Sequence, residues 1–179
     1  MTDDSLREEM HKDPVAEAVV ERVKGAVAAD SHGQPVVHVP RESWLEAVRC
    51  LKEEQQFTQC SDITAVDQLL RPDRPLPPGV DPARFEVVAN FLSHPRNRRI
   101  RFITQVPDGD GCEVESLFEL FPGTELPERE VYDLLGVRFA GHPDLTRLLL
   151  PDDWEGHPLR KDDAPARVPV QFKEAQTPR

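Results

Sequence analysis

Apolar residues recur at helical spacing near the start of the chain. Val15, Val19 and Val23 lie four positions apart, which places them on one face of a helix. Asp13-Pro14 comes directly before them, and an aspartate N-cap followed by proline at the first helical position is a common helix start. The pattern predicts a first helix over residues 14–29.

A second helical pattern follows a short run of β-branched residues at 36–39. Trp44, Ala47, Val48 and Leu51 obey the i, i+3, i+4, i+7 rule, while the intervening positions are mostly charged. Such spacing is typical of an amphipathic helix with one face in the core. We therefore expect a strand near 36–39 and a helix over residues 41–56.

Farther along, apolar and polar positions alternate with a period of two. Phe85 to Phe91 and Ile100 to Val106 both follow this pattern, and the polar residues 94–98 separate them. Two alternating runs joined by a short polar segment predict an antiparallel hairpin. Residues 57–67 favour an earlier strand, and a further strand is expected to begin at 112–115.

Proline interrupts the chain between the first of these strands and the hairpin. Residues 71–79 contain four prolines and a glycine, which excludes regular structure there. A loop of this length is unusual in a compact domain. It either grips a neighbouring chain or is a tolerated surface insertion.

The next segment carries helix start and stop signals. Ser116 and Glu119 have capping-box spacing, which predicts a short helix ended by Pro122. Thr124 then re-caps the chain for another helix. Gly136 is well placed to end that helix.

Regular patterning declines after Gly136. The triplet Gly-His-Pro occurs at 141–143 and again at 156–158, which indicates ordered but irregular chain. The sequence predicts an α+β fold, a small mostly antiparallel sheet with amphipathic helices on one side, followed by an irregular C-terminal strap. The expected divisions are a flexible N-terminus (1–12), the α+β domain (13–135), the strap (136–163) and a C-terminal tail (164–179).

Composition narrows the classes of partner. The chain has 33 acidic and 22 basic residues, a net charge of −11, which disfavours binding to nucleic acid or to anionic lipid. No apolar run approaches the roughly 20 residues that span a bilayer, and the acidic N-terminus is unlike a secretory signal. We expect a cytosolic protein, or one attached to a membrane through other subunits.

Candidate catalytic chemistry is sparse. Cys50, Cys60 and Cys112 are scattered without Cys-x-x-Cys spacing, so they predict no zinc site, iron–sulfur cluster or disulfide. His142 and His157, with an aspartate, are conceivable ligands of a metal-dependent hydrolase, although their spacing fits no compact ligand template.

The helix before Gly136 is rich in charge. Arg129 and Asp133 are four residues apart and are expected to pair on one face. The basic residues Arg160 and Lys161 follow in the strap. These charges predict either a solvated face or a polar subunit interface, in which Glu130, Asp133, Arg160 and Lys161 act through assembly.

A long stretch of this region resembles a known family. The segments EREVYDLLGV (128–137), GHPDL (141–145) and EGHPLRKD (155–162) closely resemble the C-type (30 kDa) subunit of respiratory NADH-quinone oxidoreductase, complex I. Residues 62–67 and 85–88 resemble the same family, so the resemblance covers roughly residues 36–163.

The resemblance implies a subunit of the hydrophilic arm that carries neither flavin nor iron–sulfur cluster. FMN and the clusters are expected on partner subunits, and the expected contacts are subunits B, D and I, of which D helps form the quinone site. It implies a peripheral position on the cytoplasmic side of the plasma membrane. An equivalent subunit of a membrane-bound hydrogenase-type complex is the alternative. The residues expected at the interface are those of the shared motif: Glu128, Arg129, Glu130, Tyr132, Asp133, Gly136, Gly141, His142, Pro143, Arg147, Gly156, Pro158, Arg160, Lys161 and Asp162.

Overall fold

A five-stranded sheet forms the centre of the protein. The computed structural model describes residues 13–163, so the predicted flexible N-terminus and C-terminal tail lie outside the described residues. The strand order is β1-β2-β5-β4-β3, in which only β2 and β5 run parallel. The strands are β1 (Val27–Ser31), β2 (Gln34–His38), β3 (Gln59–Asp67), β4 (Phe85–Ser93) and β5 (Arg98–Val106).

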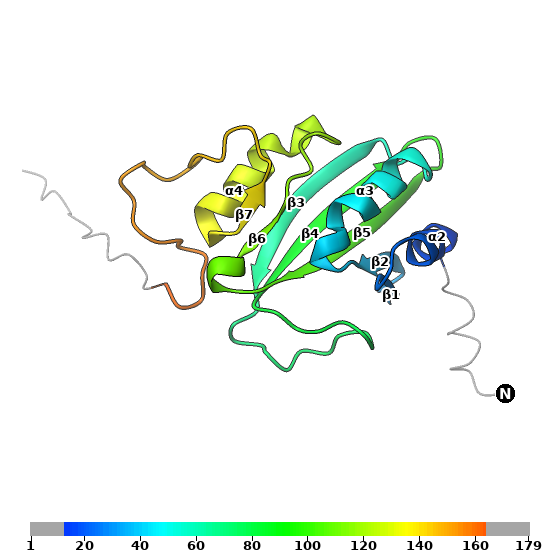
Figure 1. Ribbon diagram of the computed structural model, residues 1–179, viewed down its shortest axis with the longest axis horizontal. Coiled ribbons are helices and arrows are strands. Elements are labelled where there is room, and N and C mark those ends of the chain that lie inside the picture. Colours follow the sequence, from blue (N-terminus) through cyan, green and yellow to red (C-terminus); the bar gives the residue numbers. More distant parts are fainter. Residues whose placement is uncertain (1–12, 164–179) are drawn as a thin grey trace, which may run out of the picture.

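Within residues 13–163, three α-helices pack on one side of this sheet (Figure 1). They are α2 (Pro14–Arg22), α3 (Trp44–Glu53) and α4 (Glu125–Leu135). Their apolar faces form one core cluster with the inward side chains of the strands. The predicted mostly antiparallel sheet with amphipathic helices on one side is confirmed.

The β4–β5 hairpin provides the longest inward rows of this core. Its register pairs Phe85 with Val106 and Ser93 with Arg98, as the alternating pattern predicted. The rings of Phe91 and Phe102 meet edge to face with centroids 5.3 Å apart. Burial of these aromatic side chains stabilises the hairpin.

The first predicted helix is wrong beyond its second turn. Helix α2 ends at Arg22, and Val27–Ser31 instead form strand β1, paired antiparallel with β2. The two residues between the strands, His32 and Gly33, have φ of 56° and 82°. Positive φ at both positions is the hairpin turn that matches strand twist, and pairing across it overrides the helix propensity of the alanines before it.

The second predicted helix is shorter than its pattern. Helix α3 covers Trp44–Glu53, and Arg41–Ser43 form a 3₁₀ turn, η1. The strand predictions near 36–39 and within 57–67 are confirmed by β2 and β3.

Two predictions fail around α4. Residues 116–121 form turns rather than a helix, because the Ser116 hydroxyl donates to the Glu128 carboxylate and accepts from the Phe118 N–H. After Gly136 the chain is not wholly irregular. Strand β7 (Arg138–Ala140) pairs in parallel with β6 (Glu113–Glu115) as a separate two-stranded sheet.

The proline-rich loop is irregular, as predicted, and its base is tied to the helix-free side of the sheet. Arg74 Nε lies 2.8 Å from a carboxylate oxygen of Glu86, and both side chains are nearly buried. Gln105 contacts both groups from β5. Another short 3₁₀ turn, η2 (Gly109–Gly111), follows β5, and a third, η3 (Pro122–Thr124), leads into α4.

Candidate functional site

Helix α4 and the strap that follows it form the candidate site. The helix ends at Gly136, which adopts φ 73° as a left-handed cap and donates its N–H to the Tyr132 carbonyl at 2.8 Å. Glycine adopts this conformation without strain. The predicted helix end is therefore confirmed, and it turns the chain toward the segment that carries the Gly-His-Pro triplets.

Asp133 holds the middle of the strap. Its carboxylate accepts from Arg147 Nη1 at 2.7 Å and from three successive backbone N–H groups, those of Leu148, Leu149 and Leu150, at 2.7 to 3.0 Å. Burial alone would raise the pKa of Asp133, but these donors lower it to about 2. The carboxylate is therefore an internal anchor with no exposed surface.

The predicted pairing of Arg129 with Asp133 is wrong, because Asp133 faces the strap. Arg129 donates instead to the Thr146 carbonyl and hydroxyl and to the Arg147 carbonyl. Its nearest carboxylate belongs to Asp144, at 4.0 Å. Arg129 thus fixes strap backbone from the outer side of the helix.

Arg147 joins two parts of the strap. Its Nη2 donates to the carbonyls of Trp154 and Gly156 at 2.9 and 3.2 Å, while Nη1 binds Asp133. One guanidinium therefore holds together the two ends of the loop from residue 147 to residue 156. A planar group with five donors suits this role, since it reaches several acceptors at once.

The two candidate metal-binding histidines contact backbone carbonyl groups at different positions along α4. His142 contacts the Glu125 carbonyl through Nε2 at 3.0 Å, and its Nδ1 accepts from the Asp144 N–H. His157 Nδ1 contacts the Asp133 carbonyl at 2.9 Å. These carbonyls are eight residues apart on one helix, roughly 12 Å.

A shared metal would require both rings within about 2 Å of the ion. Within residues 13–163, no group of three or more His, Cys, Asp or Glu side chains is arranged to hold a metal ion. The hydrolase alternative with His142 and His157 as joint ligands is wrong, because each ring shapes a different turn of the strap.

The end of the strap is bound where β3 ends and β4 is about to begin. Arg84 contacts the carboxylates of Asp67, Asp108 and Asp162, which come from β3, from the turn after β5 and from the strap. The Lys161 N–H donates to Asp67 at 2.8 Å. Burial would raise the pKa of Asp67, but the hydrogen bonds from Arg84, Lys161 and Leu69 lower it.

Close packing against Gly136 completes this arrangement. A Cβ at Gly136 would lie 2.6 Å from the His157 ring and 2.7 Å from the Arg160 guanidinium. Arg160 Nε donates to the Leu135 carbonyl at 2.7 Å. Gly136 is thus required both for the helix end and for the approach of the strap.

Glu128 is fully buried on α4, where it faces the turn formed by residues 116–121. Its carboxylate accepts from the Ser116 hydroxyl at 2.5 Å and from the Leu117 N–H at 2.8 Å, and burial raises its pKa. The group fixes α4 against the turn before it. Glu128 therefore cannot belong to an exposed charged face.

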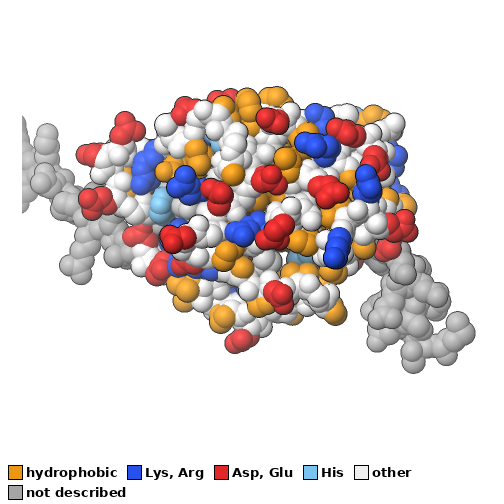
Figure 2. All heavy atoms as spheres, viewed as in Figure 1, with side chains coloured by type: hydrophobic (Ala, Val, Ile, Leu, Met, Phe, Trp, Pro, Cys, Tyr) orange, Lys and Arg blue, Asp and Glu red, His pale blue; other side chains and the backbone are white. Residues whose placement is uncertain are grey.

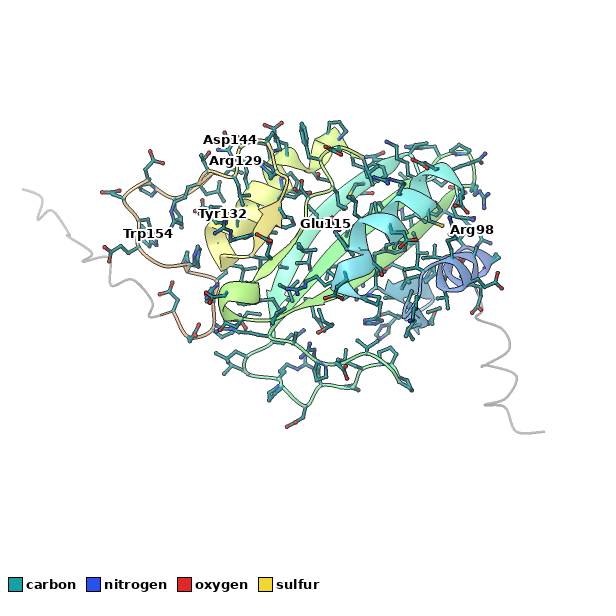
Figure 3. All side chains as sticks on the ribbon, in the orientation of Figure 1. Arg98, Glu115, Arg129, Tyr132, Asp144 and Trp154 are labelled. Atoms are coloured by element: carbon teal, nitrogen blue, oxygen red, sulfur yellow. The ribbon has the colours of Figure 1, made fainter. Side chains whose placement is uncertain are left out.

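Part of the expected interface set is accordingly internal. Asp133, Arg147 and Arg160 bind within the chain, whereas the motif residues that remain exposed are Glu130, Gly141, Pro143, Gly156, Pro158, Lys161 and Asp162. Arg129, Tyr132, Asp144 and Trp154 lie around α4 at one end of the molecule, far from Arg98 (Figure 3). Sequence reasoning missed Asp67 and Arg84, whose partners are 94 and 78 residues away.

Comparison with known proteins identifies the family. Residues 37–168 match the family described as the 30 kDa subunit of respiratory-chain NADH dehydrogenase. The chain belongs to this family. The resemblance of the 128–162 motif is thereby confirmed.

Curated members of the 30 kDa subunit family align over most of the chain. The C-type subunit of NADH-quinone oxidoreductase from Geobacter sulfurreducens is 44% identical over 142 residues, 78% of this chain and 82% of the relative. The corresponding subunit from Mycobacterium marinum is 34% identical over 178 residues, 98% of this chain and 68% of the relative. These relatives place the family in a multisubunit respiratory oxidoreductase.

Two solved structures share the fold of the 30 kDa family. The trypsin-resistant fragment of Nqo5 matches with a TM-score of 0.62 at 34% identity, covering 73% of this chain and 99% of the fragment. A chain of the archaeal membrane-bound sulfane sulfur reductase matches with a TM-score of 0.69 at 21% identity, covering 96% of this chain and 97% of that one. In the described residues, no helix is long and apolar enough to cross a membrane.

Proposed function

We propose that this chain is a non-redox structural subunit of the hydrophilic arm of proton-translocating NADH-quinone oxidoreductase. It would contact subunits B, D and I, and through D it would support the quinone site. FMN and iron–sulfur clusters would reside on partner subunits. The complex would hold the chain at the cytoplasmic side of the plasma membrane.

The observation that carries the proposal is the shape of the strap. Buried polar groups of the domain hold it in place, since Asp133 binds Arg147 and the N–H groups of residues 148–150, Asp67 accepts from the Lys161 N–H, and Arg84 pairs with Asp162. Meanwhile Leu149 and Leu159 leave 61% and 51% of their surface exposed, and Leu126 on α4 leaves 53%. A rigid segment with outward leucines binds a partner without a large loss of conformational entropy.

The rest of the surface agrees with a polar, subunit-binding protein. Acidic and basic side chains are interspersed with small apolar patches over the face in Figure 2. Non-obligate interfaces are about as apolar as the rest of a protein surface, so a mixed surface of this kind suits one. This supports docking through the strap with specificity from the surrounding charges.

Purification of the assembled membrane complex from its host tests the proposal. The chain should be present in stoichiometric amount, and its deletion should lower complex abundance and NADH-quinone reductase activity together. A complex that assembles without this chain would exclude the role. Assay of the same preparation with NADH distinguishes this role from a place in a hydrogenase-type complex.

A strap variant tests the contact surface. Leu149→Asp should reduce incorporation into the complex, because a charge replaces an exposed apolar contact. Arg49→Glu, on the exposed side of α3, is the matched control and should incorporate normally. Normal assembly of Leu149→Asp with selective loss of quinone reduction would instead indicate a direct catalytic role.

A further inference from the structure

Positive charge is concentrated at the turn between β4 and β5. Four arginines occur within six residues, although the whole chain has a net charge of −11. The turn is well defined, since the Asn97 N–H donates to the His94 carbonyl at 3.2 Å and the Ser93 hydroxyl donates to the Gln56 carbonyl at 2.8 Å. We call these residues the basic cluster: Arg96, Arg98, Arg99 and Arg101.

The chain neutralises this cluster only in part. Arg98 pairs with the Asp13 carboxylate. Arg96 and Arg101 bind amide oxygens, those of Gln55 and of Asn90 and Gln34. Arg99 is exposed and has no hydrogen-bond or ion-pair partner within residues 13–163. In the described part of the chain, four guanidinium groups therefore meet one carboxylate.

A shallow, open cleft lies beside the cluster. It holds about 430 Å³ between the β1–β2 turn and the β4–β5 turn, and it is lined by Asp13, Gly33, Gln34, Pro35, Asn97, Arg98 and Arg99. Arg98 marks the end of the molecule opposite α4 (Figure 3). The cleft is therefore separate from the strap surface.

We propose that the basic cluster and its cleft form a second docking surface, which binds an acidic polypeptide segment of a neighbouring subunit. Guanidinium groups bind carboxylates through two parallel hydrogen bonds, which fixes the register of the bound segment. Arg99, which lines the cleft, supplies the charge, and the cleft receives the backbone of the segment. This inference rests on the proposed function, since the partner is a subunit of the same assembly.

Two other occupants fit less well. Residues 1–12 of the chain contain four acidic residues but also Arg7 and Lys12, for a formal charge of −2, and Lys12 would bring a positive charge directly beside Arg98. An anionic membrane would meet a strongly acidic protein. Proline is the one apolar side chain among those that line the cleft, so the site offers little apolar surface for insertion.

Photo-crosslinking in the intact purified complex tests the proposal. A photoreactive residue is placed at position 99, at position 149 in the strap and at the exposed control position 49. Position 99 should crosslink to a peptide of another subunit that is rich in Asp and Glu. Crosslinks to residues 1–12, to lipid or to a peptide without carboxylates would overturn it.

The two proposals fail in distinguishable ways. Crosslinks from position 149 but none from position 99 would overturn the second docking surface alone. No intersubunit crosslink from either position would overturn both. If position 49 crosslinks to the same acidic peptide in the same yield as position 99, the assignment of that peptide to the basic cluster would be overturned.

Charge exchange gives an independent measurement. Arg99→Glu should lower the fraction of the chain found in the complex roughly fivefold or more, because like charges then meet across the interface. Arg99→Lys should restore most of this loss. Equal incorporation of both variants and of the unaltered chain would contradict the proposal, provided that the isolated variants melt like the unaltered chain.

Discussion

At the residue scale, one carboxylate determines the course of a segment far from it in sequence. Asp133 binds Arg147 and the N–H groups of residues 148–150 while its side chain is fully buried. A buried ion pair adds little stability by itself, but loss of one partner leaves the other uncompensated. Substitution at this residue should therefore be costly.

Asp133→Asn should lower the free energy of unfolding by about 3 to 5 kcal/mol, measured by urea denaturation at pH 7. Asp144→Asn is the matched control, because Asp144 is largely exposed and lies 4.0 Å from Arg129. The control should change stability by less than about 1 kcal/mol. Equal effects of the two changes would show that the strap is not anchored by Asp133.

The same residue predicts a pH dependence. Its donors lower the pKa of Asp133 to about 2, below the unfolded value of about 3.9. The ionised form thus stabilises the fold fully above about pH 4, and this stabilisation is lost as pH falls toward 2. The stability difference between the unaltered chain and Asp133→Asn should shrink over that range in urea titrations.

His38 should affect stability at pH values closer to neutral. Burial lowers the pKa of His38, with smaller contributions from Glu86, which raises it, and Arg74, which lowers it. The unfolded chain then binds the proton first, so stability falls as pH drops below about 6.5. His38→Gln should remove part of this loss between pH 7.5 and 5.5, and an unchanged pH profile would contradict the assignment.

At the scale of elements, two glycines allow the cost of backbone strain to be distinguished from the cost of a steric clash. Gly136 and Gly141 have φ of 73° and 81°. Of these two, only Gly136 has neighbouring atoms that an added Cβ would contact. Both elements that meet there, α4 and the strap, depend on that close approach. The pair is therefore a natural comparison.

Gly141→Ala should cost about 1 to 2 kcal/mol from its φ alone. Gly136→Ala should cost clearly more, because the strap must also move away from His157 and Arg160. Limited trypsin digestion should cut after Arg160 or Lys161 faster in Gly136→Ala than in Gly141→Ala. Equal digestion rates would mean that the strap tolerates the added methyl group.

Sequence patterns predicted the elements whose periodicity agrees with their environment. The β4–β5 hairpin, α3 and the end of α4 at Gly136 are of this kind. The alanine-rich run at 26–29 predicts a helix but forms part of β1, because the two-residue turn at His32 and Gly33 outweighs local propensity. The capping-box spacing of Ser116 predicts a helix that does not form, because its hydroxyl binds Glu128, a tertiary contact that spacing does not reveal.

For the candidate site, sequence motifs located the segment but not the direction of its side chains. Arg129 and Asp133 have pairing distance along the helix, yet each binds the strap. The contacts of Arg84 join residues up to 78 positions apart. Helical spacing describes neighbours on one element and says nothing about a strap that returns to it.

At the scale of the whole molecule, Arg84 joins the sheet to the strap. Arg84→Met should leave the buried Asp67 without its cationic partner and lower stability by about 3 to 5 kcal/mol. Arg138→Met, whose partner Glu113 lies 3.7 Å away at the surface, should cost less than about 1 kcal/mol.

Amide hydrogen exchange distinguishes local from global effects of Arg84→Met. The Lys161 amide, which donates to Asp67, should lose protection more than the amides paired between β4 and β5. A uniform loss across all these amides would contradict a specific role at the end of the strap.

The anchoring of residues 148–150 through backbone N–H groups has a consequence for the surface that they present. The carboxylate of Asp133 recognises peptide groups that every amino acid except proline possesses, so the course of the chain there does not depend on which side chains it carries. Leu149 can therefore be exchanged for any residue except proline with a change of about 0.5 kcal/mol or less in the free energy of unfolding. The side chains that the strap presents to a neighbouring subunit can therefore vary while its backbone conformation is kept.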